Sequence, residues 1–183
     1  MTLSQSRRLS RIEISKEALN FSVGHFTIFS KTDRENLHGH NFQLLCNATA
    51  ELNDEGLLFD YAILKKLMKY LCDEIDEQVI LPLQSPHLSI QEEGDYVVAG
   101  FNGEKLFFLH RDVTLLPIAN STVEEFSHYF LKRILEHPDL KDKGILALTV
   151  KVSSNTGQFG VAEWRETGRE EMLEQRNGKE SAQ

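Results

Sequence analysis

The sequence predicts an α+β fold, in which an antiparallel sheet carries two helices on one of its faces. Three observations support this prediction. An alternation of apolar and polar residues, typical of half-buried strands, occurs in the first half of the chain, and an apolar run in the second half predicts a further strand. Two other segments repeat apolar residues at helical spacing, and an Asn-Gly pair between apolar runs indicates a β-hairpin. The resulting order is strand, strand, helix, inserted hairpin, helix, strand, strand, which favours helices segregated to one face.

In the first half, alternation begins near Arg11, and a second alternating segment spans about 40–52. Asp60 is a candidate N-cap for the helix that follows, which we expect to end near 76–77. The apolar stripe of this helix is predicted core: Ile63, Leu64, Leu67, Met68, Leu71 and Ile75.

In the second half, residues 83–117 are predicted to be an insertion that contains a hairpin turning at Asn102-Gly103. A second helix is expected to start at Ser121 or Thr122, because each is followed three residues later by a glutamate, as in a capping box. Strands are expected at 145–152 and around 159–164. We therefore predict one domain over 1–168 and a charged, disordered tail over 169–183.

Composition restricts the class of protein. The chain has 183 residues, enough for one domain with a hydrophobic core, and a net charge of −8, which argues against a surface that binds nucleic acid. No apolar run reaches membrane-spanning length, and the polar start of the chain lacks a secretory signal. Cys46 and Cys72 lack metal-binding or CxxC spacing, so we expect buried thiols in a reducing compartment. These features predict a cytoplasmic protein with neither a nucleic acid nor a membrane as partner.

A candidate metal site lies in the stretch His38-Gly39-His40. Side chains two residues apart on a strand point to the same face, so both imidazoles point the same way. If the segment before them forms the neighbouring antiparallel strand, His25 reaches the same place. Three imidazoles would leave one position of a zinc ion open, which is the pattern of catalytic sites. The alternative is two surface or core histidines on one strand and an unrelated third, because H-x-H alone is a common sequence.

Several stretches together resemble the family of 6-pyruvoyltetrahydropterin synthase and 6-carboxytetrahydropterin synthase. They are F-S-x-x-H at 21–25, H-G-H-N-F at 38–42, G-L-L-F-D-Y-x-x-L-K at 56–65, N-S-T-V-E at 120–124 and V-K-V at 150–152. They extend over most of the chain outside the insertion, and their combination is far more specific than H-x-H.

The resemblance implies a tunnelling fold, which is a four-stranded antiparallel sheet with two helices on one face, here with the inserted hairpin. It implies Zn²⁺ held by His25, His38 and His40. It also implies a homotrimer or homohexamer with active sites at subunit interfaces. The implied substrate is a small pterin, 7,8-dihydroneopterin triphosphate, whose side-chain hydroxyls the metal would hold while a base removes a proton.

The residue expected to act as the base differs from that of the two named synthases. They use a cysteine a few residues before H-G-H, where this chain has Arg34 and then Glu35. The spacing E-x-x-H-G-H resembles a third branch of the family, in which glutamate replaces the cysteine. That branch cleaves the side chain by a retro-aldol step and gives 6-hydroxymethyl-7,8-dihydropterin for folate biosynthesis. Glu35 is therefore the candidate base, although a glutamate in a charged loop is equally typical of a solvated surface.

Other family positions also differ. The family's Asp-His pair aligns with Asp76-Glu77, so Asp76 is a second catalytic candidate, or else a structural residue at a helix end. The glutamate that anchors the pterin in the family aligns with Ser154. Candidates to replace it are Glu163, Glu166 and Glu124. We expect substrate contacts at Thr122, Ser154 and Arg34, the last because a guanidinium matches phosphate oxygens.

Three functional hypotheses follow. The first is a zinc-dependent pterin lyase that uses Glu35 for retro-aldol cleavage. The second is 6-carboxy-5,6,7,8-tetrahydropterin synthase of queuosine biosynthesis, against which the missing cysteine counts. The third is a catalytically degenerate homologue that keeps the fold, zinc and pterin binding without turnover, with the inserted hairpin as an interaction surface.

Overall fold

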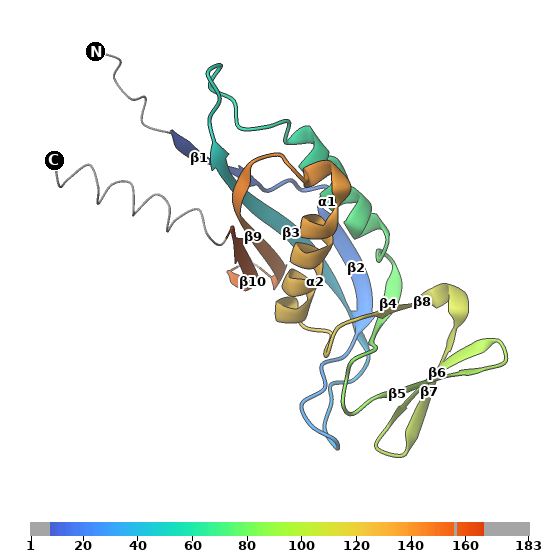
Figure 1. Cartoon of the computed structure of the whole chain (residues 1–183). Coiled ribbons are helices and arrows are strands. Elements are labelled where there is room, and N and C mark those ends of the chain that lie inside the picture. Colours follow the sequence, from blue (N-terminus) through green and yellow to red (C-terminus); the bar gives the residue numbers. More distant parts are fainter. Residues whose placement is uncertain (1–7, 156, 167–183) are drawn as a thin grey trace, which may run out of the picture.

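Two helices and a mixed β-sheet form the body of the protein, and a smaller sheet projects from one end of it (Figure 1). The structure is a computed structural model that describes residues 8–155 and 157–166. The tail predicted over 169–183 lies outside the described residues.

Among the described residues, the main sheet has seven strands in the order β10-β9-β3-β2-β4-β8, with β1 also paired to β3. Its strands are β1 (Leu9–Ile14), β2 (Asn20–His25), β3 (His38–Glu51), β4 (Gln78–Pro82), β8 (Val113–Leu116), β9 (Ile145–Asn155) and β10 (Gln158–Arg165).

Strand β3 organises the antiparallel part of this sheet. One of its edges pairs with β9, and the other is shared by β2, opposite residues 38–43, and β1, opposite residues 46–51. Strand β10 continues the antiparallel pairing beyond β9. If β1 and β2 are counted as one interrupted strand, this part corresponds to the predicted four-stranded antiparallel sheet.

The prediction of a sheet limited to those four strands was wrong at the other edge. Strand β4 pairs in parallel with β2, and β8 pairs in parallel with β4, so the sheet is larger and mixed. Strand β4 is a short apolar run that ends at Pro82, without the alternation that identifies a half-buried strand. Residue periodicity in the sequence therefore could not predict these two additional strands.

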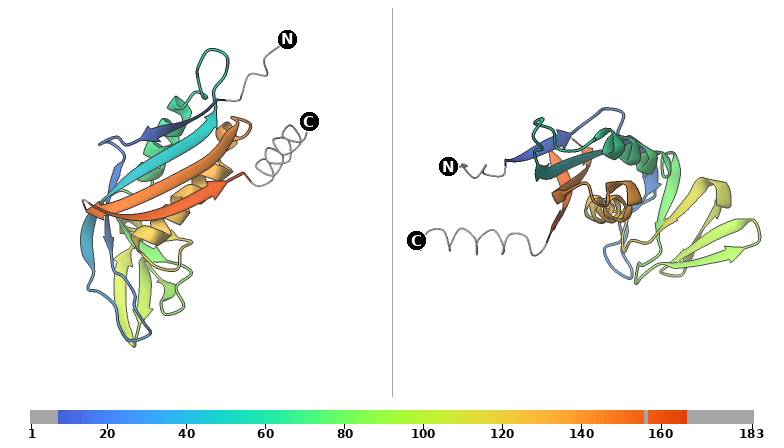
Figure 2. Two further views of the ribbon diagram at one scale, coloured as in Figure 1. Left: turned by 90° about the vertical axis from the view of Figure 1, so that its left-hand side faces the viewer. Right: turned by 45° about the horizontal axis from the view of Figure 1, so that its top comes forward.

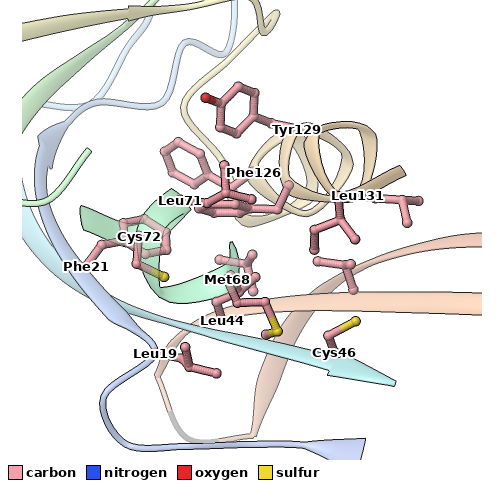
Figure 3. Close-up of a cluster of buried hydrophobic side chains, with 14 of the residues drawn as sticks. Leu19, Phe21, Leu44, Cys46, Met68, Leu71, Cys72, Phe126, Tyr129 and Leu131 are labelled. Atoms are coloured by element: carbon pink, nitrogen blue, oxygen red, sulfur yellow. The ribbon is translucent and has the colours of Figure 1, made fainter. Parts of the chain in front are cut away.

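Both helices cover one face of the main sheet, as predicted (Figure 2). Helix α1 spans Ala62–Asp73 and α2 spans Val123–Glu136, and their apolar stripes join the inward side chains of the strands in one hydrophobic cluster (Figure 3). Phe21 stacks on Phe42 at a centroid distance of 5.2 Å, and Phe126 packs edge-on against both rings. Such aromatic pairs add about 0.5–1.5 kcal/mol each beyond area burial.

The helix ends differ in part from those predicted. Thr122 caps α2 by accepting a hydrogen bond from the Glu125 amide at 3.4 Å, which confirms one of the two predicted caps. The N-cap of α1 is Tyr61 and not Asp60, although the Asp60 carboxylate accepts a hydrogen bond from the Ala62 amide at 3.0 Å. Helix α1 ends at Asp73, earlier than the predicted 76–77, and a turn follows it.

The insertion is a three-stranded antiparallel sheet and not a single hairpin. Its strands are β5 (Ser89–Glu93), β6 (Tyr96–Phe101) and β7 (Glu104–Leu109). The predicted hairpin is confirmed, with positive φ of 47° at Asn102 and 82° at Gly103, as a type I′ turn requires. After the short 3₁₀ turn His110–Asp112, the chain returns to the main sheet as β8.

The structure also bears on the cysteines and on membrane-spanning helices. Cys46 and Cys72 are buried free thiols, and burial raises the pKa of each to about 12. Among the described residues, no helix combines the length and apolar character needed to cross a membrane.

Candidate metal centre and active site

Three histidines meet on the helix-facing side of β2 and β3, as the sequence predicted. His25 ends β2 and lies directly opposite His38 in the antiparallel register, and His40 lies two residues further along β3. Each ring offers one nitrogen, and these three atoms lie within 4.8 Å of one another. This spacing is compatible with three nitrogen ligands around one ion.

The hydrogen bonds of the cluster orient two of the three rings. Nδ1 of His25 lies 2.8 Å from the Ser121 carbonyl oxygen, and Nδ1 of His38 lies 2.7 Å from the Asn36 carbonyl oxygen. Because a carbonyl oxygen only accepts, Nδ1 of each ring carries the proton and Nε2 keeps its lone pair.

The His25 Nε2 atom is buried and has no hydrogen-bond partner among the described residues. A divalent cation would supply this missing partner, and a backbone carbonyl behind a ligating imidazole is the usual second contact at zinc sites. The residues therefore fit Zn²⁺ with three nitrogen ligands and one open position.

Burial keeps His25 in the form that binds metal. Desolvation lowers the pKa of His25 from 6.5; the Ser121 carbonyl opposes this change, and the charges of His38 and His40 add to it. The carboxylate of Glu35 acts in the opposite direction without reversing the net shift. Since metal binding requires a neutral imidazole, the lowered pKa favours ligation at neutral pH.

The histidine cluster lies on the same face of the sheet as the hydrophobic core, next to Phe42. Phe42 follows His40 on the same face, at ring-centroid distances of 5.4 Å from His25 and 5.9 Å from His40. Gly39, between two of the histidines, is not needed for a close backbone approach, because a Cβ there would meet only the Val23 carbonyl at 4.0 Å.

Glu35 lies beside the histidine cluster, on the loop between β2 and β3. Its carboxylate accepts a hydrogen bond from the Thr27 amide at 2.9 Å. Its partial burial alone would raise the pKa of Glu35, but the amide and hydroxyl of Thr27 and the charges of His38 and His25 outweigh this and lower it. The carboxylate is therefore ionised at neutral pH, which is the state that a proton acceptor needs.

Arg34 is committed to contacts within the protein. Its guanidinium lies over the rings of Phe26 and Phe101, donates to the Glu35 carbonyl oxygen at 2.7 Å and approaches the Glu104 carboxylate at 3.6 Å. The side chain is 14% exposed. The substrate contact predicted for Arg34 stays a prediction, and these contacts do not favour it.

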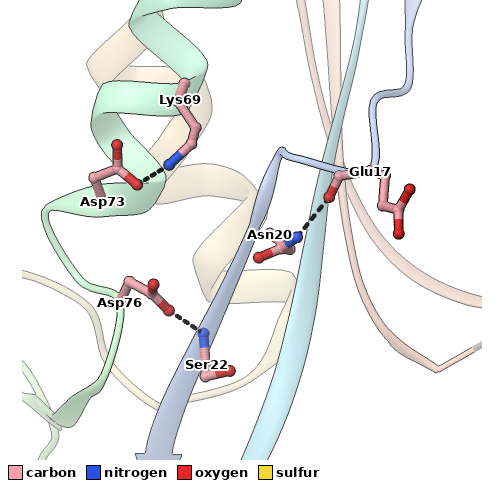
Figure 4. A network of polar contacts seen from close by, with 6 residues as sticks. All are labelled: Glu17, Asn20, Ser22, Lys69, Asp73 and Asp76. Carbon is pink, nitrogen blue, oxygen red and sulfur yellow. Dashed lines mark hydrogen bonds and ion pairs between the residues drawn. The ribbon is translucent and has the colours of Figure 1, made fainter.

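Asp76 has a clear structural partner (Figure 4). Its carboxylate accepts a hydrogen bond from the Ser22 amide at 2.7 Å, while the Glu77 amide donates to the Ser22 carbonyl oxygen at 2.7 Å. The turn after α1 is thereby fixed to β2 at the point where β4 begins to pair. The catalytic role predicted for Asp76 stays a prediction.

The other residues predicted to contact the substrate lie at the start of α2 and on β9. Thr122 uses its hydroxyl to cap α2, and Ser154 is half-buried near the end of β9. Of the glutamates considered as pterin anchors, Glu163 accepts a hydrogen bond from Thr149 at 3.4 Å on β10. The substrate contacts predicted for Thr122 and Ser154 stay predictions.

Three residues support the site although the sequence predicted no role for them there. Thr27 holds Glu35, Ser121 orients His25, and the Asn120 side chain donates to the Ile28 carbonyl oxygen at 2.8 Å and accepts from the Ile28 amide at 3.0 Å. Asn120 and Ser121 lie in the N-S-T-V-E stretch that carries the family resemblance. Their partners are more than ninety residues away in the chain, so local patterns could not identify them.

Comparisons with known proteins find similarity over most of the chain. A family model described as 6-pyruvoyl tetrahydropterin synthase matches residues 13–163. A provisional 6-carboxy-5,6,7,8-tetrahydropterin synthase from Methanocaldococcus jannaschii is 29% identical over 141 residues, which are 76% of this chain and 85% of that protein. A 6-carboxy-5,6,7,8-tetrahydropterin synthase from Rickettsia typhi is 27% identical over 103 residues, which are 55% of this chain and 70% of that protein.

A solved structure is similar in fold and in sequence. The crystal structure of 6-pyruvoyl tetrahydropterin synthase from Plasmodium vivax has a TM-score of 0.81 and 28% identity, covering 87% of this chain and 99% of that chain. Two further structures of the P. vivax protein carry a substitution of a catalytic glutamate, by alanine in one and by cysteine in the other.

Proposed function

The chain belongs to the 6-pyruvoyl tetrahydropterin synthase family, and from this premise we propose that it is a zinc-dependent lyase acting on 7,8-dihydroneopterin triphosphate or a related pterin. The proposed reaction is retro-aldol cleavage of the side chain, which leaves 6-hydroxymethyl-7,8-dihydropterin. The observation that carries this proposal is the Glu35 carboxylate, which the Thr27 amide holds at 2.9 Å and whose charge acts on His25, near the position where the named synthases have a cysteine.

Each proposed group has a defined task. A zinc ion held by the three imidazoles would act as a Lewis acid on the side-chain hydroxyls. Glu35 accepts the proton of the second hydroxyl, the bond between the first and second side-chain carbons breaks, and the second carbon leaves as an aldehyde. The electron pair left on the first carbon is delocalised into the pterin ring, and that carbon then takes up a proton. Thr27 fixes the carboxylate oxygen during proton transfer.

The P. vivax protein supports the choice of base, because its catalytic residue is also a glutamate. In this chain, Glu35 precedes H-G-H by three positions, and its carboxylate lies beside the cluster. A carboxylate is a weaker base than a thiolate, but it is fully ionised at neutral pH when its pKa is lowered.

A second candidate is 6-carboxy-5,6,7,8-tetrahydropterin synthase of queuosine biosynthesis. The names of the M. jannaschii and R. typhi relatives favour it. The missing cysteine disfavours it, because the free cysteines of the chain are buried in the core and their raised pKa keeps them protonated.

Product analysis tests the proposal. Zinc-loaded protein is incubated with 7,8-dihydroneopterin triphosphate, and the pterins are oxidised and separated by fluorescence chromatography. We expect 6-hydroxymethylpterin. A 6-carboxy product together with acetaldehyde would instead identify the second candidate. Tight pterin binding without any product would indicate a catalytically degenerate homologue.

We further propose a homotrimer or homohexamer with sites between subunits, as family membership implies. Strand β10, at one end of the strand order of the main sheet, exposes Phe159 and Val161, each by 45%, and edge strands with apolar side chains favour association. Size-exclusion chromatography with light scattering measures the mass in solution, and a monomer at all concentrations would contradict this assembly.

A further inference from the structure

The loop that carries Glu35 packs against the inserted sheet. Phe26 and Ile28, at the start of this loop, are 1% and 8% exposed and belong to the hydrophobic cluster of the insertion. The other buried members of that cluster are Leu81, Leu88, Val97, Ala99 and Phe101. Thr27, which holds the Glu35 carboxylate, therefore lies between two side chains that the insertion fixes.

Arg34 forms a second link between the insertion and Glu35. Its guanidinium carbon lies 4.9 Å from the centroid of the Phe26 ring and 5.5 Å from that of Phe101, which belongs to β6. A guanidinium between two rings is attracted by their negative faces and loses freedom to rotate. From this position Arg34 donates to the Glu35 carbonyl oxygen at 2.7 Å and approaches Glu104 of β7 at 3.6 Å.

The segment before α2 holds the same loop from a second direction. Asn120 forms two hydrogen bonds with the backbone of Ile28, and the adjacent Ser121 carbonyl oxygen accepts from His25. The loop of Glu35 and the histidine cluster thus share one support, while Phe101 and Arg34 connect only the loop to the insertion.

We propose that the inserted sheet positions the catalytic base. In this inference, Arg34 is a positioning residue, held by Phe101 and Glu104, that fixes Glu35 relative to the histidine cluster. The inference rests on the proposed function, in which Glu35 is the base. A general base must lie within hydrogen-bond reach of its proton, and a displacement of about 1 Å costs on the order of 100-fold in rate. A surface loop without such support is mobile.

The first test removes the aromatic contact from the insertion. Phe101→Ala is compared with Phe107→Ala, the same change at a side chain of the insertion that is 55% exposed. We expect Phe101→Ala to lower kcat by about 10- to 100-fold with KM within about twofold, and to speed amide hydrogen exchange over 26–37. Zinc content should not change, because the ligands lie on β2 and β3. Phe107→Ala should alter none of these quantities.

The second test leaves the core of the insertion intact. Arg34→Lys keeps the positive charge but loses the planar fork that stacks on two rings while donating to Glu35. We expect about a tenfold fall in kcat, equal for 7,8-dihydroneopterin triphosphate and for 7,8-dihydroneopterin without phosphates. A rise in KM confined to the triphosphate would overturn the inference and make Arg34 a phosphate contact.

The two tests separate failure of this inference from failure of the proposed function. If the wild-type protein turns over neither pterin, the proposed function fails, and hydrogen exchange over 26–37 still decides whether the insertion holds the loop. Unchanged exchange and unchanged kcat in both Phe101→Ala and Arg34→Lys would overturn the positioning role.

Discussion

Two hydrogen bonds from backbone amides join Glu35 and Thr27. The Thr27 amide donates to the Glu35 carboxylate at 2.9 Å, and the Glu35 amide donates to the Thr27 carbonyl oxygen at 2.9 Å. Glu35, the proposed base, is therefore held at its side chain and at its backbone by one residue of the same loop. This pairing explains how an acidic residue in a charged surface loop keeps a defined position beside three histidines.

We expect Glu35→Gln to abolish most of the activity without loss of zinc. The amide keeps the size of the side chain but does not accept a proton, and a general base contributes about 100- to 10,000-fold. Single-turnover kinetics and metal analysis measure the two effects. Glu55→Gln, in the exposed turn after β3, is the matched control. Wild-type turnover in Glu35→Gln would assign the proton transfer to another group.

We expect His38→Ala to lose bound zinc. His38 contributes one of three ligand atoms, and removing a ligand leaves two nitrogens, which are too few for a stable protein zinc site. Metal analysis after dialysis against a weak chelator measures the loss, with His87→Ala in the exposed part of the insertion as control. Full retention of zinc in His38→Ala would exclude the cluster as the metal site.

The metal-free protein should lose stability as the pH falls. Burial lowers the pKa of His25, with Ser121 opposing and His38 and His40 adding to the shift, so the folded pKa lies below the 6.5 of the unfolded chain. Between these two values the unfolded state binds more protons, so the free energy of unfolding decreases as the pH drops below about 6.5. Urea unfolding of chelator-treated protein between about pH 7.5 and pH 5.5 measures this slope.

The variant His25→Gln isolates this contribution. It removes the titrating group and keeps a side chain that can donate to the Ser121 carbonyl oxygen. Its unfolding free energy should depend less on pH than that of the wild type, whereas His87→Gln should follow the wild type. An equal pH dependence in His25→Gln and the wild type would contradict the assignment to His25.

We expect Asp76→Ala to destabilise the protein and Asp76→Asn to be close to the wild type. Alanine leaves the Ser22 amide without its acceptor, at a cost of about 1–3 kcal/mol, whereas asparagine keeps an acceptor oxygen. Urea unfolding and turnover are measured for both variants. A stable Asp76→Asn variant with strongly reduced kcat would instead support the catalytic role predicted from the sequence.

The antiparallel part of the fold and the histidine cluster could be predicted because their signals are local. The alternation along β3 fixes which side chains share a face, and it places His38 and His40 in line with Phe42. The hairpin at Asn102-Gly103 was predictable because positive φ at both turn positions restricts the residue types.

What the sequence did not predict depends on contacts between distant segments. Strand β4 is too short and too uniformly apolar to show a period, so the parallel edge was missed. The stacking of Arg34 on Phe101 joins a loop to a strand of the insertion, and no spacing rule connects them. The sequence therefore predicted only a phosphate contact for Arg34, which stays a prediction, and gave no sign of its contacts with two aromatic rings.

Gly160 gives a prediction about packing. A Cβ at this position of β10 would overlap the carbonyl group of Val123 and the amide nitrogen of Glu124, at the start of α2. Backbone atoms in a helix cannot give way as the end of a flexible side chain can, so Gly160→Ala must push α2 away from the sheet. We expect a loss of about 1–3 kcal/mol in the free energy of unfolding, the usual cost of overpacking.

The matched control for Gly160→Ala is Gly39→Ala. A Cβ at Gly39 would find only the Val23 carbonyl oxygen at 4.0 Å, which is an ordinary contact. Its free energy of unfolding should stay within about 0.5 kcal/mol of the wild type. Because α2 starts next to Asn120 and Ser121, Gly160→Ala should also disturb the support of His25 and weaken zinc binding. If Gly160→Ala loses stability but keeps full zinc affinity, the start of α2 and the histidine cluster are not coupled.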